Sequence, residues 1–201
     1  MTYTTLRVSA RGTVLFEDHA QRLGPLVRAP FERFAATASE GIYAVQALGS
    51  ELLIERRRGT RLIEGLEARF MVSPVVARAG PFAKPAPPSP YDSVRAAGAL
   101  TLLTNSEGDE IYETCVASVM AWDGQSLVLV PSSRPRVLST AETFVAREFR
   151  HRRSPIRRES DWGLLVMNAV ASVTPVFPER QPFDPALLAE IRAAVEETAG
   201  R

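Results

Sequence analysis

The sequence contains one cysteine, Cys115, and two histidines among its 201 residues. A single thiol cannot form an internal disulfide, and so few cysteines and histidines exclude a multi-cysteine metal site. We therefore predict that the protein binds no metal and works in the reducing cytoplasm.

Excess charge and long apolar runs are also absent. The 24 basic and 23 acidic residues leave a net charge of +1, so no bulk charge draws the chain to nucleic acid or anionic lipid. The apolar runs 127–131 and 163–167 are far shorter than the roughly 20 residues of a membrane span. We expect neither a nucleic-acid nor a membrane partner. With 45% hydrophobic residues, the chain can bury one core or two small ones.

Lysine is almost missing as well. Of the 24 basic residues, 23 are arginines and one is Lys84. A lysine amine can form a Schiff base, whereas a guanidinium stays protonated and cannot. Two interpretations stay open: an arginine-rich composition left one lysine by chance, or the chain keeps Lys84 for amine chemistry.

Prolines divide the chain. Segment 80–90 cannot form a helix or a central strand because it holds five prolines. It separates a predicted N-terminal α+β domain, residues 1–79, from a predicted C-terminal α/β domain, residues 91–201. Lys84 lies within this predicted linker. The prolines are at positions 81, 85, 87, 88 and 90.

Hydrophobic spacing predicts the main elements. Apolar positions at near-helical intervals predict a helix over 31–48. Segments 52–57 and 61–70 alternate and predict a hairpin. A capping box that starts at Ser139 predicts a helix over 140–153.

The order of these features resembles the class IV aminotransferases, the fold type IV pyridoxal-phosphate enzymes, and is most similar to aminodeoxychorismate lyases. The first matching segment holds an acidic-x-His-x-x-Arg-Leu helix start, and the second holds Lys84 seven positions before Tyr91-Asp92-x-x-Arg95. The matching segments are 15–23, 84–95, 102–114, 122–131 and 165–176. The resemblance implies an α+β, two-domain, D-amino acid aminotransferase-like architecture in a short member, and a homodimer.

The resemblance also implies a site for pyridoxal 5′-phosphate. Lys84 would form the Schiff base and shuttle a proton, Arg22 would hold the phosphate, and Glu113 would face the pyridine nitrogen. A carboxylate there favours the pyridinium form, which withdraws electrons from a carbanion. The remaining implied cofactor contacts are Tyr91, Ser118, Thr140 and Asn168.

The phosphate-binding turn departs from the family pattern. A Leu-Pro-Gly-Ile-Thr-Arg run is usual there, whereas residues 138–143 read Leu-Ser-Thr-Ala-Glu-Thr. Thr140 replaces the glycine that lets backbone approach phosphate closely. Glu142 brings a negative charge toward an anion site unless its carboxylate turns back to the Ser139 amide. Ser118 stands where the family typically has asparagine.

Three functions follow as hypotheses. The first is a PLP-dependent lyase or aminotransferase, similar to aminodeoxychorismate lyase, that acts on a small, amino-bearing, carboxylate-rich substrate. The second keeps the fold without the cofactor, as a ligand-binding protein or a cofactor-independent biosynthetic enzyme. The third is a basic interaction protein that binds polyanions through the arginine-dense run 147–158, with steep salt dependence.

Overall fold

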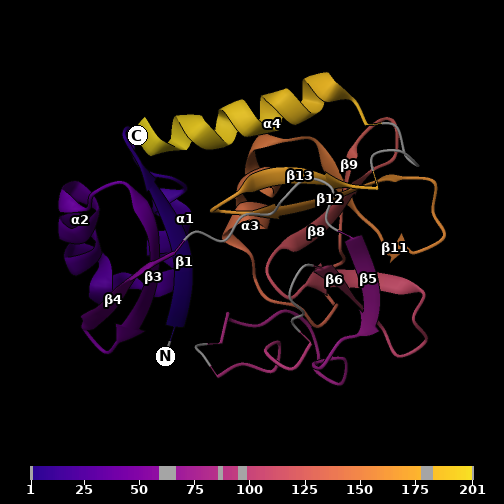
Figure 1. Ribbon diagram of the computed structural model, residues 1–201, viewed down its shortest axis with the longest axis horizontal. Coiled ribbons are helices and arrows are strands. Elements are labelled where there is room, and N and C mark those ends of the chain that lie inside the picture. The colour runs from indigo at the N-terminus through magenta and orange to yellow at the C-terminus, as the bar shows by residue number, and fades with distance from the viewer. Residues whose placement is uncertain (1, 59–66, 86–87, 95–98, 178–182, 201) are drawn as a thin grey trace.

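The computed structural model describes residues 2–58, 67–85, 88–94, 99–177 and 183–200. Two sheets organise the chain: a four-stranded sheet of order β2-β1-β3-β4 near the N-terminus and a nine-stranded sheet formed by the rest (Figure 1). We call the first sheet with its helices the first unit, and the second sheet with α3 (Thr140–Glu148) the second unit. The elements of the first unit are β1 (Thr2–Ser9), β2 (Gly12–Thr13), α1 (Phe16–Leu23), the 3₁₀ turn η1 (Pro25–Val27), α2 (Arg28–Thr37), β3 (Gly41–Leu48) and β4 (Glu51–Arg57).

Helices α1 and α2 cover one face of the first sheet. Side chains alternate along β1, so that Leu6 and Val8 point into this core. Phe31 of α2 is fully buried there and its ring stacks on Phe16 of α1 at 5.0 Å between centroids. The other face of β1, with Tyr3 and Thr5, is thereby turned away from the two helices.

The predicted helix over 31–48 is wrong beyond Thr37. Residues 41–48 instead form β3, which pairs antiparallel with β1 from Thr2↔Ala47 to Val8↔Gly41. Ile42, Tyr43 and Val45 fit a pleated, half-buried surface, and pairing on both sides of β3 overrides the helical spacing of the apolar residues.

The second sheet begins earlier in the chain than the prolines suggest. Strand β5 (Glu67–Val72) lies within the predicted N-terminal domain, yet it pairs in parallel with β6 (Ala99–Thr104). The predicted hairpin of 52–57 with 61–70 is therefore wrong for the described residues, because β4 pairs with β3; residues 59–66 lie outside them. The division into domains 1–79 and 91–201 stays a prediction.

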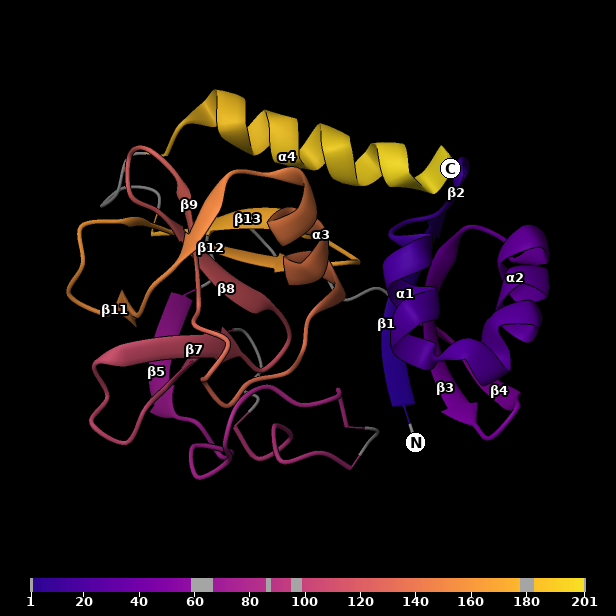
Figure 2. The same cartoon turned by 180° about the vertical axis from the view of Figure 1, so that it is seen from behind.

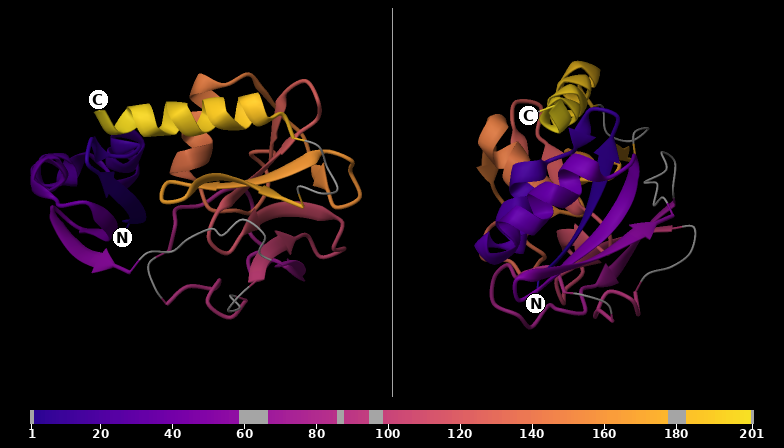
Figure 3. Two further views of the ribbon diagram at one scale, coloured as in Figure 1. Left: turned by 45° about the horizontal axis from the view of Figure 1, so that its top comes forward. Right: turned by 90° about the vertical axis from the view of Figure 1, so that its left-hand side faces the viewer.

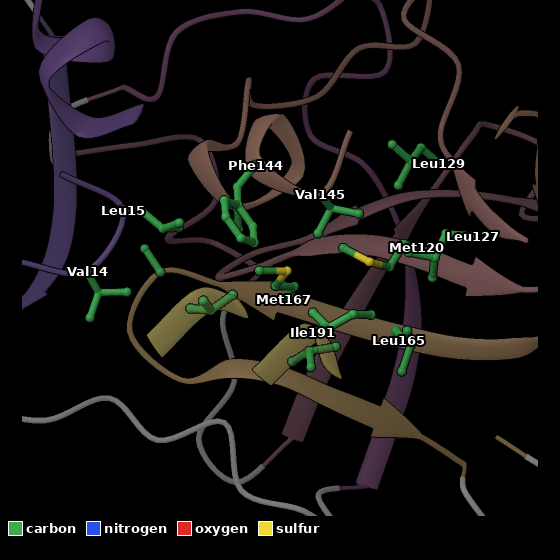
Figure 4. Packing of buried hydrophobic residues seen from close by; sticks show 14 of the residues in the cluster. Val14, Leu15, Met120, Leu127, Leu129, Phe144, Val145, Leu165, Met167 and Ile191 are labelled. Atoms are coloured by element: carbon green, nitrogen blue, oxygen red, sulfur yellow. The ribbon is translucent and has the colours of Figure 1, made fainter. Parts of the chain in front are cut away.

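The remaining strands build the sheet that carries most of the core. They are β7 (Glu110–Thr114), β8 (Ser118–Trp122), β9 (Leu127–Leu129), β10 (His151–Arg153), β11 (Ile156–Arg157), β12 (Gly163–Asn168) and β13 (Ser172–Val176). Helix α3 (Thr140–Glu148) packs on this sheet through Phe144 and Val145, which meet Met167 and Ile191 (Figure 4). The predicted helix over 140–153 is wrong at its end, since residues 151–153 form β10 beside β9.

The C-terminal helix connects the two units. Helix α4 (Pro185–Glu197) crosses the second unit, and the 3₁₀ turn η2 (Thr198–Gly200) reaches the first unit (Figures 1, 2 and 3). There the Leu15 amide donates to Thr198 Oγ1 at 2.8 Å, and Arg7 pairs with Glu196. In the part of the chain that the structure describes, no helix is both long and apolar enough to span a membrane.

The contact between Gly12 and η2 gives a test of this connection. Gly12 has φ +123°, and a Cβ there would lie 2.4 Å from the carbonyl oxygen of Ala199. We expect G12A to lower the free energy of unfolding by about 3 kcal/mol in urea titrations, against about 1 kcal/mol for the control G124A. Gly124 has φ +94° and nothing within 4 Å of its Cβ position. Equal losses in the two variants would contradict the contact.

Candidate active site

A short backbone bridge fixes the segment that carries Lys84. The Phe82 amide donates to the carbonyl oxygen of Arg136 at 2.9 Å, and the Leu138 amide donates to that of Phe82 at 2.8 Å. The two segments run parallel, with Phe82 opposite Val137. Lys84 follows Phe82 by two residues, as Ser139 follows Val137. The amine-bearing segment is therefore attached beside the start of α3.

The start of α3 gathers donors suited to an anion. Ser139 caps the helix, since its Oγ accepts from the Glu142 amide at 3.3 Å. Ser118 Oγ lies 2.8 Å from Ser139 Oγ and 3.0 Å from the carbonyl oxygen of Met167. Thr140 is the first helical residue and is buried. Free amides and the helix dipole make such an N-terminus attractive to phosphate.

Arg22 approaches the same segment from α1. Its guanidinium donates to the carbonyl oxygen of Leu138. Burial lowers the pKa of Arg22 to about 10, and the nearby Asp18 carboxylate opposes that shift. The side chain remains a cation at neutral pH and lies one residue from the cap of α3.

Two more basic side chains contact β1. His19 is fully buried, with Nδ1 2.7 Å from Thr4 Oγ1 and no hydrogen-bond partner on Nε2 among the residues that the structure describes. Burial keeps the pKa of His19 well below 6.5, and the charges of Arg22 and Lys84 lower it further. Lys84 Nζ donates to Thr5 Oγ1 at 3.3 Å and lies 5.1 Å from the centre of the Tyr3 ring. Lys84 therefore lies against β1, Arg22 reaches the segment before α3, and the charges of both act on His19.

The acid at the other end of the site is Glu113 on β7. Its Oε1 accepts from the Tyr91 hydroxyl at 2.6 Å, and its Oε2 accepts from the Val137 amide at 3.0 Å. Burial raises the pKa of Glu113 to about 7, although both hydrogen bonds and the charge of Arg136 act in the opposite direction. Burial and the Glu113 charge together raise the pKa of Tyr91 above its usual value. Glu113 therefore changes charge near neutral pH.

Asn168 supports the site from the end of β12. Its Oδ1 accepts from the amides of Val170 and Ala171 at 2.9 and 2.7 Å, and its Nδ2 lies 3.4 Å from the Val116 carbonyl oxygen. These bonds close the turn between β12 and β13. They hold Asn168 beside Met167, which contacts Ser118.

The carboxylate expected to repel an anion is neutralised. Glu142 does turn its amide to Ser139, but its carboxylate bonds Arg136 at 2.7 Å and Arg153 at 2.8 Å. The expected return of that carboxylate to the Ser139 amide is replaced by two guanidinium contacts. Other members of the arginine-dense run are paired too, as with Arg147 on Asp18.

The structure thus gathers the predicted site residues around residues 137–140. Arg22, Glu113 and Ser118 contact this segment directly, Thr140 belongs to it, and Lys84 is attached beside it through Phe82. Tyr91 joins through Glu113, and Asn168 through its neighbour Met167. Sequence reasoning missed the roles of Tyr3, Thr5 and the Val137 amide, because only the tertiary arrangement brings them to Lys84 and Glu113.

This donor set fits pyridoxal phosphate at two of three points. Arg22 and the capped start of α3 suit the phosphate, and Lys84 offers the amine. At the third point the chemistry of Glu113 suits a protonated ring nitrogen, but Tyr91 already holds Glu113 Oε1.

The buried Glu113 makes stability depend on pH. With a folded-state pKa of about 7 against 4.5 when unfolded, its stabilising protonation is complete below about pH 4.5 and is lost as pH rises through about 7. We expect wild type to lose up to about 3 kcal/mol relative to Glu113→Gln between pH 4.5 and 8 in urea titrations. Exposed Glu51→Gln serves as the control. A constant difference between wild type and E113Q over this range would show that Glu113 does not titrate in this way.

Comparisons with known proteins agree with this architecture. No family model and no curated protein sequence matches the chain. The structure of 4-amino-4-deoxychorismate lyase from Pseudomonas aeruginosa matches with a TM-score of 0.67 and 14% identity, over 100% of this chain and 91% of that chain. A hypothetical aminotransferase from Mycobacterium tuberculosis, with alpha-ketoglutarate and PMP bound, matches with a TM-score of 0.64 and 15% identity, over 98% and 88%.

A fold IV-transaminase from Curtobacterium pusillum matches with a TM-score of 0.63 and 15% identity, over 98% of this chain and 84% of that chain. At identities this low, the structural similarity establishes the fold alone. The predicted α+β, fold type IV architecture is confirmed. The chain has the fold shared by aminodeoxychorismate lyases and class IV aminotransferases.

Proposed function

We propose that the chain is a PLP-dependent enzyme of fold type IV, a lyase or aminotransferase for a small, amino-bearing, carboxylate-rich substrate. The observation that carries the proposal is that residues 136–140 contact the Arg22 guanidinium and the buried acid Glu113 and are bridged to the segment that carries Lys84. Similar folds occur in a lyase and in an aminotransferase with PMP bound, which supports this class.

Each group has a defined task in this proposal. Arg22 and the first turn of α3, with Ser139 and Thr140, bind the phosphate. Lys84 would hold the cofactor through its aldehyde carbon, with loss of water; once the substrate amine had displaced it, its freed amine would move a proton at the carbon that bears the substrate amine. Glu113, as a carboxylate, stabilises a proton on the ring nitrogen. The bound cofactor supplies an electron sink for a carbanion.

The basic groups of the site also suit the substrate. Substrate carboxylates are attracted by Arg22 and by the positive end of α3. A homodimer and the choice between lyase and transaminase outcome are further parts of the proposal, and they rest on the resemblance alone.

One observation favours a second candidate function. The Tyr91 hydroxyl and the Val137 amide already occupy both oxygens of Glu113. A chain of this fold that binds an anionic ligand without the cofactor needs no free Glu113, and Arg22, Lys84 and α3 would still recognise the anion.

Lysine replacement separates the two candidates. We expect added pyridoxal phosphate to give wild-type protein a visible absorption band, and borohydride followed by peptide mass mapping to place the adduct on Lys84. Lys84→Ala and the charge-matched K84R should both lack the band, because neither alanine nor a guanidinium forms an imine. Since Lys84 is the only lysine in the sequence, any remaining adduct would map to the N-terminal amine.

The opposite results are equally clear. No band in wild type at saturating cofactor, or a band that K84R retains, would refute the Schiff-base role of Lys84 and favour the cofactor-free candidate.

A further inference from the structure

The hydrogen bond between Tyr91 and Glu113 closes one end of the site from within the chain. The two oxygen atoms lie 2.6 Å apart, and the residues are 5% and 4% exposed. Hydrogen bonds to an ionised carboxylate are shorter and stronger than those between neutral groups. Displacing the Tyr91 hydroxyl from Glu113 is therefore costly unless another donor takes its place.

Different elements hold the two partners. Glu113 lies on β7, opposite Leu103 of β6 and Ser118 of β8, so the sheet fixes its position. Tyr91 lies on the turn that follows Ser89, and its ring packs in an apolar cluster. The cluster comprises Val75, Val94 and Leu103, with Met71, Phe82, Cys115 and Val137 packed against it. Tyr91 is therefore not part of the strand pairing that fixes Glu113.

The two oxygens of Glu113 differ in how easily their donors can leave. The Val137 amide on Oε2 belongs to the backbone that is bridged to Phe82. The Tyr91 hydroxyl on Oε1 belongs to a side chain that no backbone pairing holds in place. A ligand's N–H group that approaches Glu113 therefore competes with Tyr91 and not with Val137.

We propose that Tyr91 is an internal competitor at the ring-nitrogen end of the site: its hydroxyl holds Glu113 Oε1 in the free protein and gives way to the protonated ring nitrogen of a bound pyridine. This inference rests on the proposed function and adds a residue that sets the affinity of the site. Tyr91 is a positioning residue in this scheme, because it acts through Glu113.

The test uses a probe that cannot react with Lys84. The compound 4′-deoxypyridoxine 5′-phosphate has the ring nitrogen and the phosphate of the cofactor but no aldehyde. In Tyr91→Phe the ring still fills the apolar cluster, but Glu113 Oε1 loses the hydrogen bond from the Tyr91 hydroxyl. We expect calorimetry to show about tenfold tighter binding of the probe to Y91F than to wild type, because the buried acceptor is then satisfied only on binding.

Two further variants control the comparison. Tyr112→Phe removes the hydroxyl of the residue before Glu113. That side chain points to the other face of β7, so the dissociation constant of the probe should not change. In a Glu113→Gln background the gain from Y91F should fall below about threefold, since the competition is for the carboxylate. A role in packing alone would not give this dependence on Glu113.

The outcomes separate this inference from the proposed function. Tighter binding to Y91F, or binding to Y91F where wild type binds nothing measurable, supports the role of Tyr91. Equal or weaker binding to Y91F overturns it, and the proposed function then stands if borohydride still traps pyridoxal phosphate on Lys84 in wild type. Absence of probe binding by both proteins, together with absence of a Lys84 adduct, refutes both.

Discussion

The backbone bridge between Phe82 and residues 136–138 is the interaction on which the site depends. It holds a proline-rich segment, which has few donors of its own, against the strand-like run that leads into α3. The same run receives Arg22 from the first unit and presents the Val137 amide to Glu113 on the second sheet. One short stretch of chain thereby sets the positions of the cation, the acid and the segment with the amine.

Ion pairs with at least one buried partner keep that stretch in place. Asp18 on α1 is almost fully buried and binds Arg147 at the last turn of α3. Glu142, in the first turn of α3, pairs with both Arg136 and Arg153. Arg136 and Glu142 are each 5% exposed, so removing Glu142 would leave the buried Arg136 guanidinium without its ion-pair partner, which is strongly destabilising. The ion pairs thus couple α1 to α3, while the contact of Thr198 with Leu15 connects the units at the C-terminus.

The sequence singled out candidate residues of the site but not the contacts between them. Lys84 could be singled out because the chain has no other lysine, and Arg22 and Glu113 because their order along the chain resembles a known family. The bond of Tyr91 to Glu113 could not be foreseen, since it joins a turn to a strand 22 residues away in the chain. The ion pairs of Glu142 with Arg136 and Arg153 could not be foreseen for the same reason.

Elements were predicted well where local signals decide and poorly where pairing decides. The cap at Ser139 marks the start of α3 because its hydroxyl serves its own helix. Residues 41–48 carry apolar residues at helical spacing, and their strand conformation follows from neighbours on both sides. Strand β5 likewise owes its place to β6, some 30 residues later, which no local pattern in residues 67–72 encodes.

A crystal structure of the chain grown with pyridoxal phosphate would test the central claim most directly. The account predicts continuous density from Lys84 Nζ to the cofactor, with its phosphate at Ser139, Thr140 and Arg22 and its ring nitrogen at Glu113. A cofactor bound elsewhere, or crystals at saturating cofactor in which Tyr91 still holds Glu113 and Lys84 is unmodified, would contradict it.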